Sequence, residues 1–311
     1  MGVLYFLAGL RNSVLTAFFS VLTYLGSEIT AVAVPMIVYW CFSKRRAYFL
    51  TANVALGSAV CQGLKFLCKV PRPFVRDPKF EIVESARADA GGYSFPSGHT
   101  ESAASLFGSL ALILRNRGAR IVCVAFIVLV GFSRMYLGVH YPTDVLGGLL
   151  IGLALMAALY PAYKASEKNP KVFPVLFGAA AACSLIGALL IEFGPRGAEE
   201  DPANWAEAVK NLNLLAGCMA AFSISIPVER KYIRFQTKAV WWVQVLKAGL
   251  GLSLAMGLRL GLKPLFAALL GDLGIASFLR YFLMTLFCLL VWPMAFHILN
   301  RLGRRREEGA A

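Results

Sequence analysis

The stretch YSFPSGHTESAASLFGSLALIL, residues 93–114, joins a short polar turn to a long apolar run. Pro96 and Ser97 are residue types that commonly begin a helix, because proline fits the first turn and a serine hydroxyl caps free amides. The residues that follow predict a helix over 97–114. Gly98 and His99 stand at the start of this helix. A turn between two apolar segments does not require these two residues, so they indicate that this end of the helix has a second role.

The composition indicates what kind of protein this helix belongs to. Hydrophobic residues make up 58% of the 311 residues and charged residues only 15%, against about 25% charged residues in soluble domains. The apolar residues form runs of about 20, which is the length that crosses a bilayer. A shorter apolar segment at 13–26 is compatible with an interfacial, re-entrant or spanning position, so whether residues 3–26 cross the membrane stays open. We predict an all-α polytopic transmembrane bundle of about nine spans, at residues 29–43, 47–68, 97–114, 120–137, 144–162, 172–193, 209–227, 239–260 and 276–299.

The basic residues predict an orientation in the membrane. The formal net charge of +14 would by itself suit a nucleic-acid partner, but the lysines and arginines cluster in short loops at alternate helix ends. Because this is the positive-inside pattern, we expect these loops to face the cytoplasm and the lipid bilayer, not nucleic acid, to be the partner. Short loops favour a bacterial plasma membrane. The sequence does not predict an oligomeric state. The basic loops are residues 43–46, 115–120, 163–171, 228–238 and 301–306.

Two polar stretches fall at the predicted outer ends of helices. In KFLCKVPRP, residues 65–73, Lys65 and Arg72 are two helical turns apart, so both side chains can lie on one face before the prolines end the helix. In PSGHT, residues 96–100, the free amides of a helix start suit an anion. Gly98 lets backbone and ligand approach closely, and the Ser97 hydroxyl can either cap the helix or donate to a phosphate oxygen.

A third stretch, SRMYLGVHYPTD at residues 133–144, adds a cation and an acid–base pair on the same side. Arg134 ends one predicted helix, while His140 and Asp144 span the start of the next with a spacing that can bring carboxylate and imidazole together. Such a carboxylate would fix the imidazole tautomer. Three cations with helix amides fit a phosphate dianion, and two histidines suit a two-step transfer. Since no carboxylate cluster offers a divalent-ion site, we expect no metal and no cofactor.

The three motifs, K-x6-RP, PSGH and SR-x5-H-x3-D, together resemble the type 2 phosphatidic acid phosphatase (PAP2) superfamily, and the resemblance covers residues 25–165. It implies a membrane-embedded lipid phosphatase that works through a phosphohistidine. It also implies that His140 is the nucleophile, Asp144 its partner and His99 the general acid. The phosphate would be held by Lys65, Arg72, Ser97, Gly98 and Arg134. The implied substrates are undecaprenyl diphosphate, phosphatidic acid, phosphatidylglycerol phosphate or a sphingoid phosphate.

Two other functions remain open at this stage. A glucose-6-phosphatase-like enzyme would use the same chemistry on a soluble sugar phosphate, and a non-catalytic lipid-binding or transport protein would reuse the scaffold. We expect an N-terminal apolar or interfacial segment at 1–26, a catalytic transmembrane core at 27–193 and a C-terminal transmembrane extension with a basic cytoplasmic tail at 194–311. The core's polar site should face the outside. The third histidine, His297, is expected to be a packing or interfacial residue.

Overall fold

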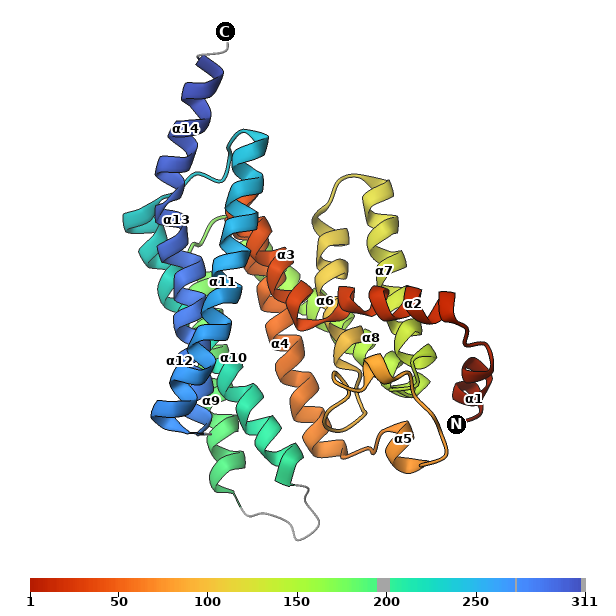
Figure 1. Ribbon diagram of the computed structural model, residues 1–311. Coiled ribbons are helices and arrows are strands. Elements are labelled where there is room, and N and C mark those ends of the chain that lie inside the picture. The colour runs from red at the N-terminus through yellow and green to blue at the C-terminus, as the bar shows by residue number, and fades with distance from the viewer. Residues whose placement is uncertain (195–201, 272, 309–311) are drawn as a thin grey trace. The chain divides into compact units, whose positions relative to one another are not determined.

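The computed structural model describes residues 1–194, 202–271 and 273–308, and every regular element in these ranges is helical (Figure 1). The predicted all-α class is therefore confirmed. In chain order the elements are α1 (Gly2–Gly9), α2 (Ser13–Leu22), the 3-10 helix η1 (Thr23–Gly26), α3 (Glu28–Cys41), α4 (Lys44–Cys68), α5 (Pro73–Arg76), η2 (Glu84–Ala86), α6 (Gly98–Ile113), α7 (Arg117–Tyr136), α8 (Pro142–Ala165), α9 (Val172–Phe193), α10 (Pro202–Val228), the π-helical turn η3 (Glu229–Ile233), α11 (Trp241–Leu270), α12 (Gly274–Leu286), a second π-helical turn η4 (Phe287–Val291), α13 (Trp292–Met294) and α14 (Phe296–Glu308).

The helices agree with a multi-pass membrane protein. Within the described ranges, 7 helical segments are long and apolar enough to cross a membrane. An eighth crossing is formed if Ser13–Gly26 and Glu28–Cys41, which meet at a bend of 53°, make one broken span. The count is close to the predicted nine. The difference lies in this bent pair and in α6, whose 16 residues give a length of about 24 Å, less than the roughly 30 Å of the hydrocarbon core.

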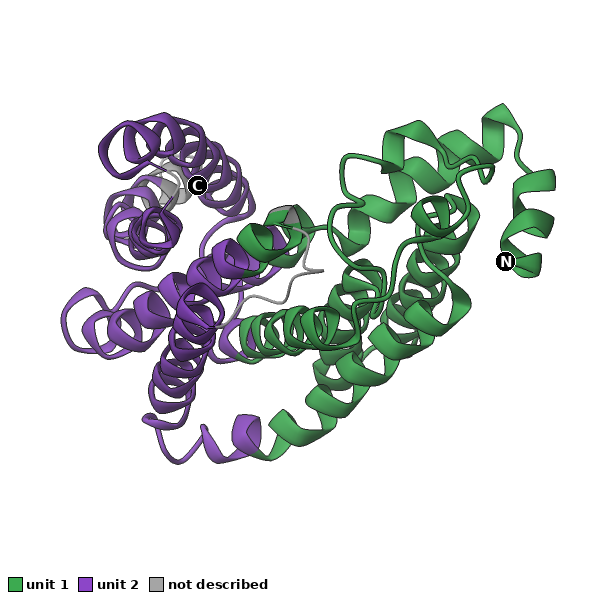
Figure 2. Cartoon of the chain, turned by 90° about the horizontal axis from the view of Figure 1, so that it is seen from below, with its two compact units in different colours: residues 1–32, 49–161, 197–208 green, residues 33–48, 162–196, 209–311 purple. Residues whose placement is uncertain are grey.

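The chain folds into two compact units, each assembled from separate stretches (Figure 2). The first unit contains Met1–Val32, Phe49–Pro161 and Gly197–Ala208, and the second contains Ala33–Tyr48, Ala162–Arg196 and Val209–Ala311. All the polar residues singled out from the sequence, except His297, belong to the first unit. The three-part division at residues 26 and 193 remains a prediction.

Small residues bring α8 directly against α6 in the first unit. A Cβ added at Gly148 would lie 2.4 Å from the Ser97 carbonyl oxygen, and one at Gly152 would lie 2.6 Å from the Ala104 Cβ. Because there is no side chain at these positions, the two helix starts can approach closely. The Ser97 amide donates to the Asp144 carbonyl at 3.0 Å, so the beginnings of α6 and α8 are hydrogen-bonded to each other.

The long connection from α4 to α6 is held by its own hydrophobic cluster. The Ser94 amide donates to the Val70 carbonyl at 2.8 Å, and the Val83 amide donates to the Leu137 carbonyl at 3.1 Å. These bonds tie the connection to itself and to the turn after α7. The buried cluster beneath it joins α2, the connection and the end of α7, and consists of Phe19, Ala86, Ala90, Tyr136, Leu137 and Val139.

The second unit has an apolar and aromatic interior with a few buried polar side chains. The Phe177 ring lies 4.9 Å from the Phe222 ring, which links α9 to α10. Lys44 pairs with Glu229 at 2.5 Å. Lys247 is fully buried, and its ammonium donates to the Gln236 carbonyl at 3.3 Å. These charged groups therefore have partners inside the unit.

Candidate active site

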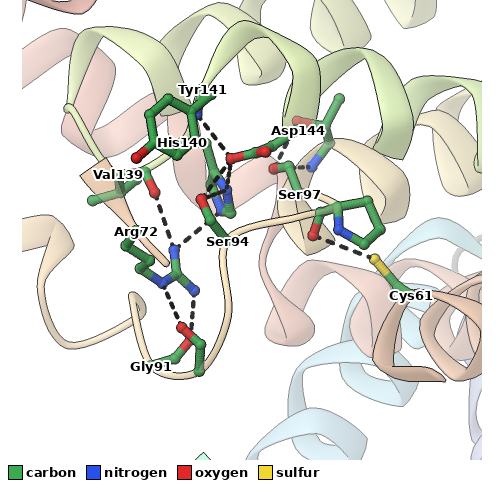
Figure 3. A network of polar contacts seen from close by, with 12 residues as sticks. Cys61, Arg72, Gly91, Ser94, Ser97, Val139, His140, Tyr141 and Asp144 are labelled. Atoms are coloured by element: carbon green, nitrogen blue, oxygen red, sulfur yellow. Dashed lines mark hydrogen bonds and ion pairs between the residues drawn. The ribbon is translucent and has the colours of Figure 1, made fainter. Parts of the chain in front are cut away.

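His140 and Asp144 form the centre of the candidate site (Figure 3). His140 lies in the turn between α7 and α8, and its Nδ1 is 3.2 Å from Asp144 Oδ2. The same oxygen accepts hydrogen bonds from the Ser94 hydroxyl at 2.5 Å and the Tyr141 amide at 2.8 Å. A carboxylate oxygen with three such neighbours favours the tautomer that carries its proton on Nδ1. Nε2 then carries the lone pair of the imidazole.

Arg72 connects the imidazole to two loops. Its Nη1 lies 3.3 Å from His140 Nε2 and donates to the Val139 carbonyl at 3.2 Å. Its Nε donates to the Gly92 carbonyl at 3.0 Å and its Nη2 donates to the Gly91 carbonyl. Arg72 is 3% exposed, and its guanidinium lies against Nε2 of His140 (Figure 3). A phosphate bound at Nε2 would therefore also contact the Arg72 guanidinium.

The start of α6 presents free amides and open space. The Ser97 hydroxyl caps the helix, accepting from the Thr100 amide at 3.4 Å and the Thr100 hydroxyl at 3.0 Å. Its own hydroxyl proton is not used in these bonds. A Cβ added at Gly98 would have nothing within 4 Å, so there is free volume directly beside the helix start. The geometry suits an oxyanion that accepts from the first amides of the helix.

Arg134 is fully buried near the end of α7 with unused donors. Its Nη1 donates to the Thr23 hydroxyl in η1 at 2.8 Å. Its Nε and Nη2 are buried without a hydrogen-bond partner in the part of the chain that the structure describes, and the same is true of His99 Nε2. Buried polar groups normally find partners. These unpaired donors of Arg134 are available to an anion that accepts hydrogen bonds.

The remaining predicted residues act on the same centre. The charges of Arg72, Arg134 and Lys65, and the imidazole of His99, all act on His140. Burial first, and then these positive charges, hold the pKa of His140 well below its usual value of 6.5. His140 is therefore neutral at neutral pH, which is the form in which an imidazole nitrogen can attack.

The structure thus brings together residues from four separate stretches of the chain. Ser94 and Thr23 were not predicted from the sequence. Ser94 does lie in the polar stretch 93–100, three residues before Ser97, and that position was its signal. Thr23 had none, because it is an isolated hydroxyl in an apolar segment. Within the described ranges, no group of three or more His, Cys, Asp or Glu side chains is placed to hold a metal ion.

Comparisons with known proteins show which family the chain resembles. Residues 46–168 match the family model of the PAP2 superfamily, and residues 214–305 match that of the PAP2 superfamily phosphatase, transmembrane extension. The chain is 34% identical over 149 residues to undecaprenyl-diphosphatase BcrC of Bacillus subtilis strain 168, covering 47% of this chain and 73% of that protein. It is 39% identical over 90 residues to phosphatidylglycerophosphatase B of the same organism, covering 24% and 44%. It is 27% identical over 164 residues to lipid A 4'-phosphatase of Porphyromonas gingivalis, covering 50% and 70%.

Proposed function

Because the chain belongs to the PAP2 superfamily of membrane lipid phosphatases and carries the transmembrane extension, we propose that it hydrolyses a lipid phosphate or lipid diphosphate through a phosphohistidine. The observation that carries the proposal is the geometry of one imidazole. His140 has its Nδ1 on Asp144 and its Nε2 3.3 Å from the Arg72 guanidinium. A phosphate bound by Arg72 would place its phosphorus next to the Nε2 lone pair.

In the first half of the reaction, Nε2 of His140 attacks phosphorus. A P–N bond forms, and the bond from phosphorus to the leaving oxygen breaks. The imidazolium of His99, whose charged form is favoured by the bound phosphate dianion, gives its proton to that oxygen. The product leaves as a lipid alcohol, or as a lipid monophosphate if the substrate is a diphosphate.

In the second half, water attacks the phosphohistidine. The neutral His99 accepts a proton from this water, the P–N bond breaks, and inorganic phosphate leaves with His140 restored to its neutral form. Asp144 stabilises the positive charge that develops on the imidazole in both halves. Atoms and charge therefore balance without any further reactant.

The charge on the transferring phosphoryl group is met by side chains and amides. The charges of Lys65, Arg72 and Arg134 all act on His140, and the Ser97 hydroxyl and the Gly98 amide belong to the open start of α6. Cationic donors of this kind stabilise the equatorial oxygens in phosphoryl transfer. We assign the reaction to these groups, with no metal ion and no cofactor.

The substrate and setting follow from the relatives and the charge pattern. The relatives named above act, by their names, on undecaprenyl diphosphate, phosphatidylglycerophosphate and lipid A. For this chain the candidate lipids are undecaprenyl diphosphate, phosphatidic acid, phosphatidylglycerol phosphate and sphingoid phosphates. The protein is a multi-pass integral membrane protein. The basic loops favour a site on the extracytoplasmic face of a bacterial plasma membrane, with residues 27–193 carrying the chemistry and 194–311 forming the extension.

Two histidine variants test the mechanism. In purified protein in detergent, His140→Ala should abolish phosphate release from a panel of lipid phosphates and diphosphates. His297→Ala is the matched control, since this histidine belongs to α14 in the second unit and its Nε2 contacts the Ile233 carbonyl at 2.9 Å. The control should keep activity within about twofold of wild type. Retained turnover by His140→Ala, with correct folding, would show that this imidazole is not the nucleophile.

A further inference from the structure

A pocket that includes Lys65 of the proposed phosphate site lies within the first compact unit. Its polar lining comes from three parts of the chain. These are α4, the end of the long connection before α6, and the first turns of α10, which contribute Gln62, Lys65, Gly92, Tyr93, Asn204 and Glu207. We call this space the Glu207 pocket.

The first turns of α10 are fixed to the unit that holds the site. Trp205 is buried and meets the Phe66 ring edge-on, with centroids 5.5 Å apart and planes at 70°. Such a contact adds aromatic stabilisation to the burial of a large side chain. This segment lies between the two ranges that match the family models, so it is not part of either match.

The neighbouring glycines allow Glu207 to approach the loop that holds Arg72. A Cβ at Gly91 would lie 3.1 Å from Glu207 Oε2, and one at Gly92 would lie 3.4 Å from it. Gly92 also has a φ of +67°, a conformation that favours glycine. The carbonyls of the same two glycines accept hydrogen bonds from Arg72. Gly91 and Gly92 therefore lie next to both the Glu207 carboxylate and the Arg72 guanidinium, which is proposed to bind the phosphate.

The charge of Glu207 attracts both Lys65 and Arg72. A carboxylate in this position weakens the binding of any phosphate dianion, because like charges repel. It gains a function only if the substrate offers a hydrogen-bond donor beside the phosphate. A carboxylate accepts hydrogen bonds and cannot donate, while the amides of Gln62 and Asn204 can do both. Hydroxyl groups fit this combination better than a second phosphate, whose negative charge Glu207 repels.

We propose that the Glu207 pocket binds a hydroxyl-bearing group that carries the scissile phosphate, and that Glu207 discriminates against diphosphates. The substrate class is then a phosphate monoester of a polyol, such as a glycerol phosphate or sugar phosphate headgroup. This inference rests on the proposed function and selects among its candidate substrates. The headgroup of a lipid and a soluble polyol phosphate share this chemistry, and the assay separates them.

The decisive variant is Glu207→Gln, which removes the charge and keeps the shape. With phosphatidylglycerol phosphate as substrate, kcat/KM should fall about tenfold, the size expected when a hydrogen bond to a charged group is lost. With undecaprenyl diphosphate, kcat/KM should stay level or rise. The matched control is Glu84→Gln, an exposed glutamate of the long connection that pairs with Arg87. It should leave the ratio of the two rates within twofold of wild type.

A binding measurement gives a readout that needs no turnover. In thermal unfolding of the detergent-solubilised protein, glycerol 3-phosphate should stabilise wild type more than inorganic phosphate does. This difference should vanish in Glu207→Gln. If no lipid phosphate is turned over at all, the proposed function fails, and this measurement still decides whether the pocket selects a polyol.

Three outcomes would overturn the inference. If Glu207→Gln changed kcat/KM equally for phosphatidylglycerol phosphate and undecaprenyl diphosphate, Glu207 would be only a counter-ion of Lys65 and Arg72. A wild-type preference for the diphosphate would mean that the pocket does not exclude a second phosphate. Equal stabilisation by glycerol 3-phosphate and inorganic phosphate would mean that the pocket does not bind the polyol. Faster turnover of glycerol 3-phosphate than of the lipid would support the pocket and identify a soluble substrate.

Discussion

The bond between Asp144 and His140 sets a quantitative expectation for the variant Asp144→Asn. The aspartate Oδ2 contacts His140 Nδ1 and accepts from the Ser94 hydroxyl and the Tyr141 amide. Asparagine has nearly the same shape, and whichever of its groups takes the place of Oδ2 faces both the Tyr141 amide and Nδ1. It has no negative charge, and it can turn its NH₂ group toward Nδ1. The imidazole proton would then move to Nε2 and remove the lone pair that attacks.

The size of the expected loss in kcat follows from the distance between His140 Nδ1 and Asp144 Oδ2. Two unit charges 3.2 Å apart, at an effective dielectric constant of about 20, interact by about 5 kcal/mol. At 1.36 kcal/mol per tenfold in rate, the full interaction corresponds to roughly four powers of ten. The imidazole charge is only partly developed in the transition state. We therefore expect kcat of Asp144→Asn to fall by about 10²- to 10⁴-fold.

The assay compares kcat with folding in the same preparations. Asp144→Asn should lose about 1–3 kcal/mol of stability, because the Tyr141 amide loses its carboxylate acceptor. Asp77→Asn is the control, since Asp77 lies in the long connection and accepts from the Tyr5 hydroxyl at 2.7 Å on the surface. Its kcat should stay within about twofold of wild type. If folded Asp144→Asn kept more than a third of the wild-type kcat, the carboxylate would not be acting on the nucleophile.

Three further predictions concern protons, space and metal ions. Since burial and nearby cations hold the pKa of His140 well below 6.5, the neutral nucleophile persists into acid. The acid limb of kcat/KM, which reports the free enzyme, should therefore lie below pH 6.5, after correction for the separately measured ionisation of the substrate phosphate. An acid limb at or above pH 6.5 would contradict a lowered pKa of His140. Gly98→Ala should leave the protein at least as stable as wild type, because its Cβ meets nothing within 4 Å, yet it should raise KM about tenfold by filling the anion space. Gly63→Ala, where a Cβ also has open space, should change neither quantity, and an unchanged KM in Gly98→Ala would place the phosphate elsewhere. EDTA should leave phosphate release unchanged. Loss of activity with EDTA and its rescue by Mg²⁺ would overturn the proposal that Lys65, Arg72 and Arg134 stabilise the phosphoryl charge without a metal ion.

Periodicity and spacing were sufficient for the parts of the molecule that are local in sequence. Apolar runs predicted the helical class, and the four-residue spacing of His140 and Asp144 anticipated a contact within one turn of a helix start. The bend at η1 was not predictable in the same way. An apolar segment of the length of 13–26 has the same pattern whether it lies in the interface or forms half of a broken span.

Contacts between distant segments had no such signal. Ser94 reaches Asp144 only because the long connection folds back on α7, and Thr23 meets Arg134 across 111 positions of chain. The acidic residue Glu207 belongs by sequence to the start of the C-terminal extension, yet it lines a pocket with Lys65. These pairings depend on tertiary packing, which leaves no period in the residues themselves. Their polar side chains look like ordinary surface or turn residues when only the sequence is read.

The hydrogen bonds of Arg72 have a consequence for the resting enzyme. Its guanidinium has five N–H groups, and four of them are directed at the carbonyls of Gly91, Gly92 and Val139 and at Nε2 of His140. A phosphate that takes a bidentate grip on this side chain must compete with one of these bonds, and the bond to Nε2 is the only one that is not to a backbone carbonyl. When it is exchanged for a phosphate oxygen, the lone pair of the imidazole is released. In the proposed mechanism, binding of the phosphate to Arg72 would therefore free Nε2 of His140 to attack it.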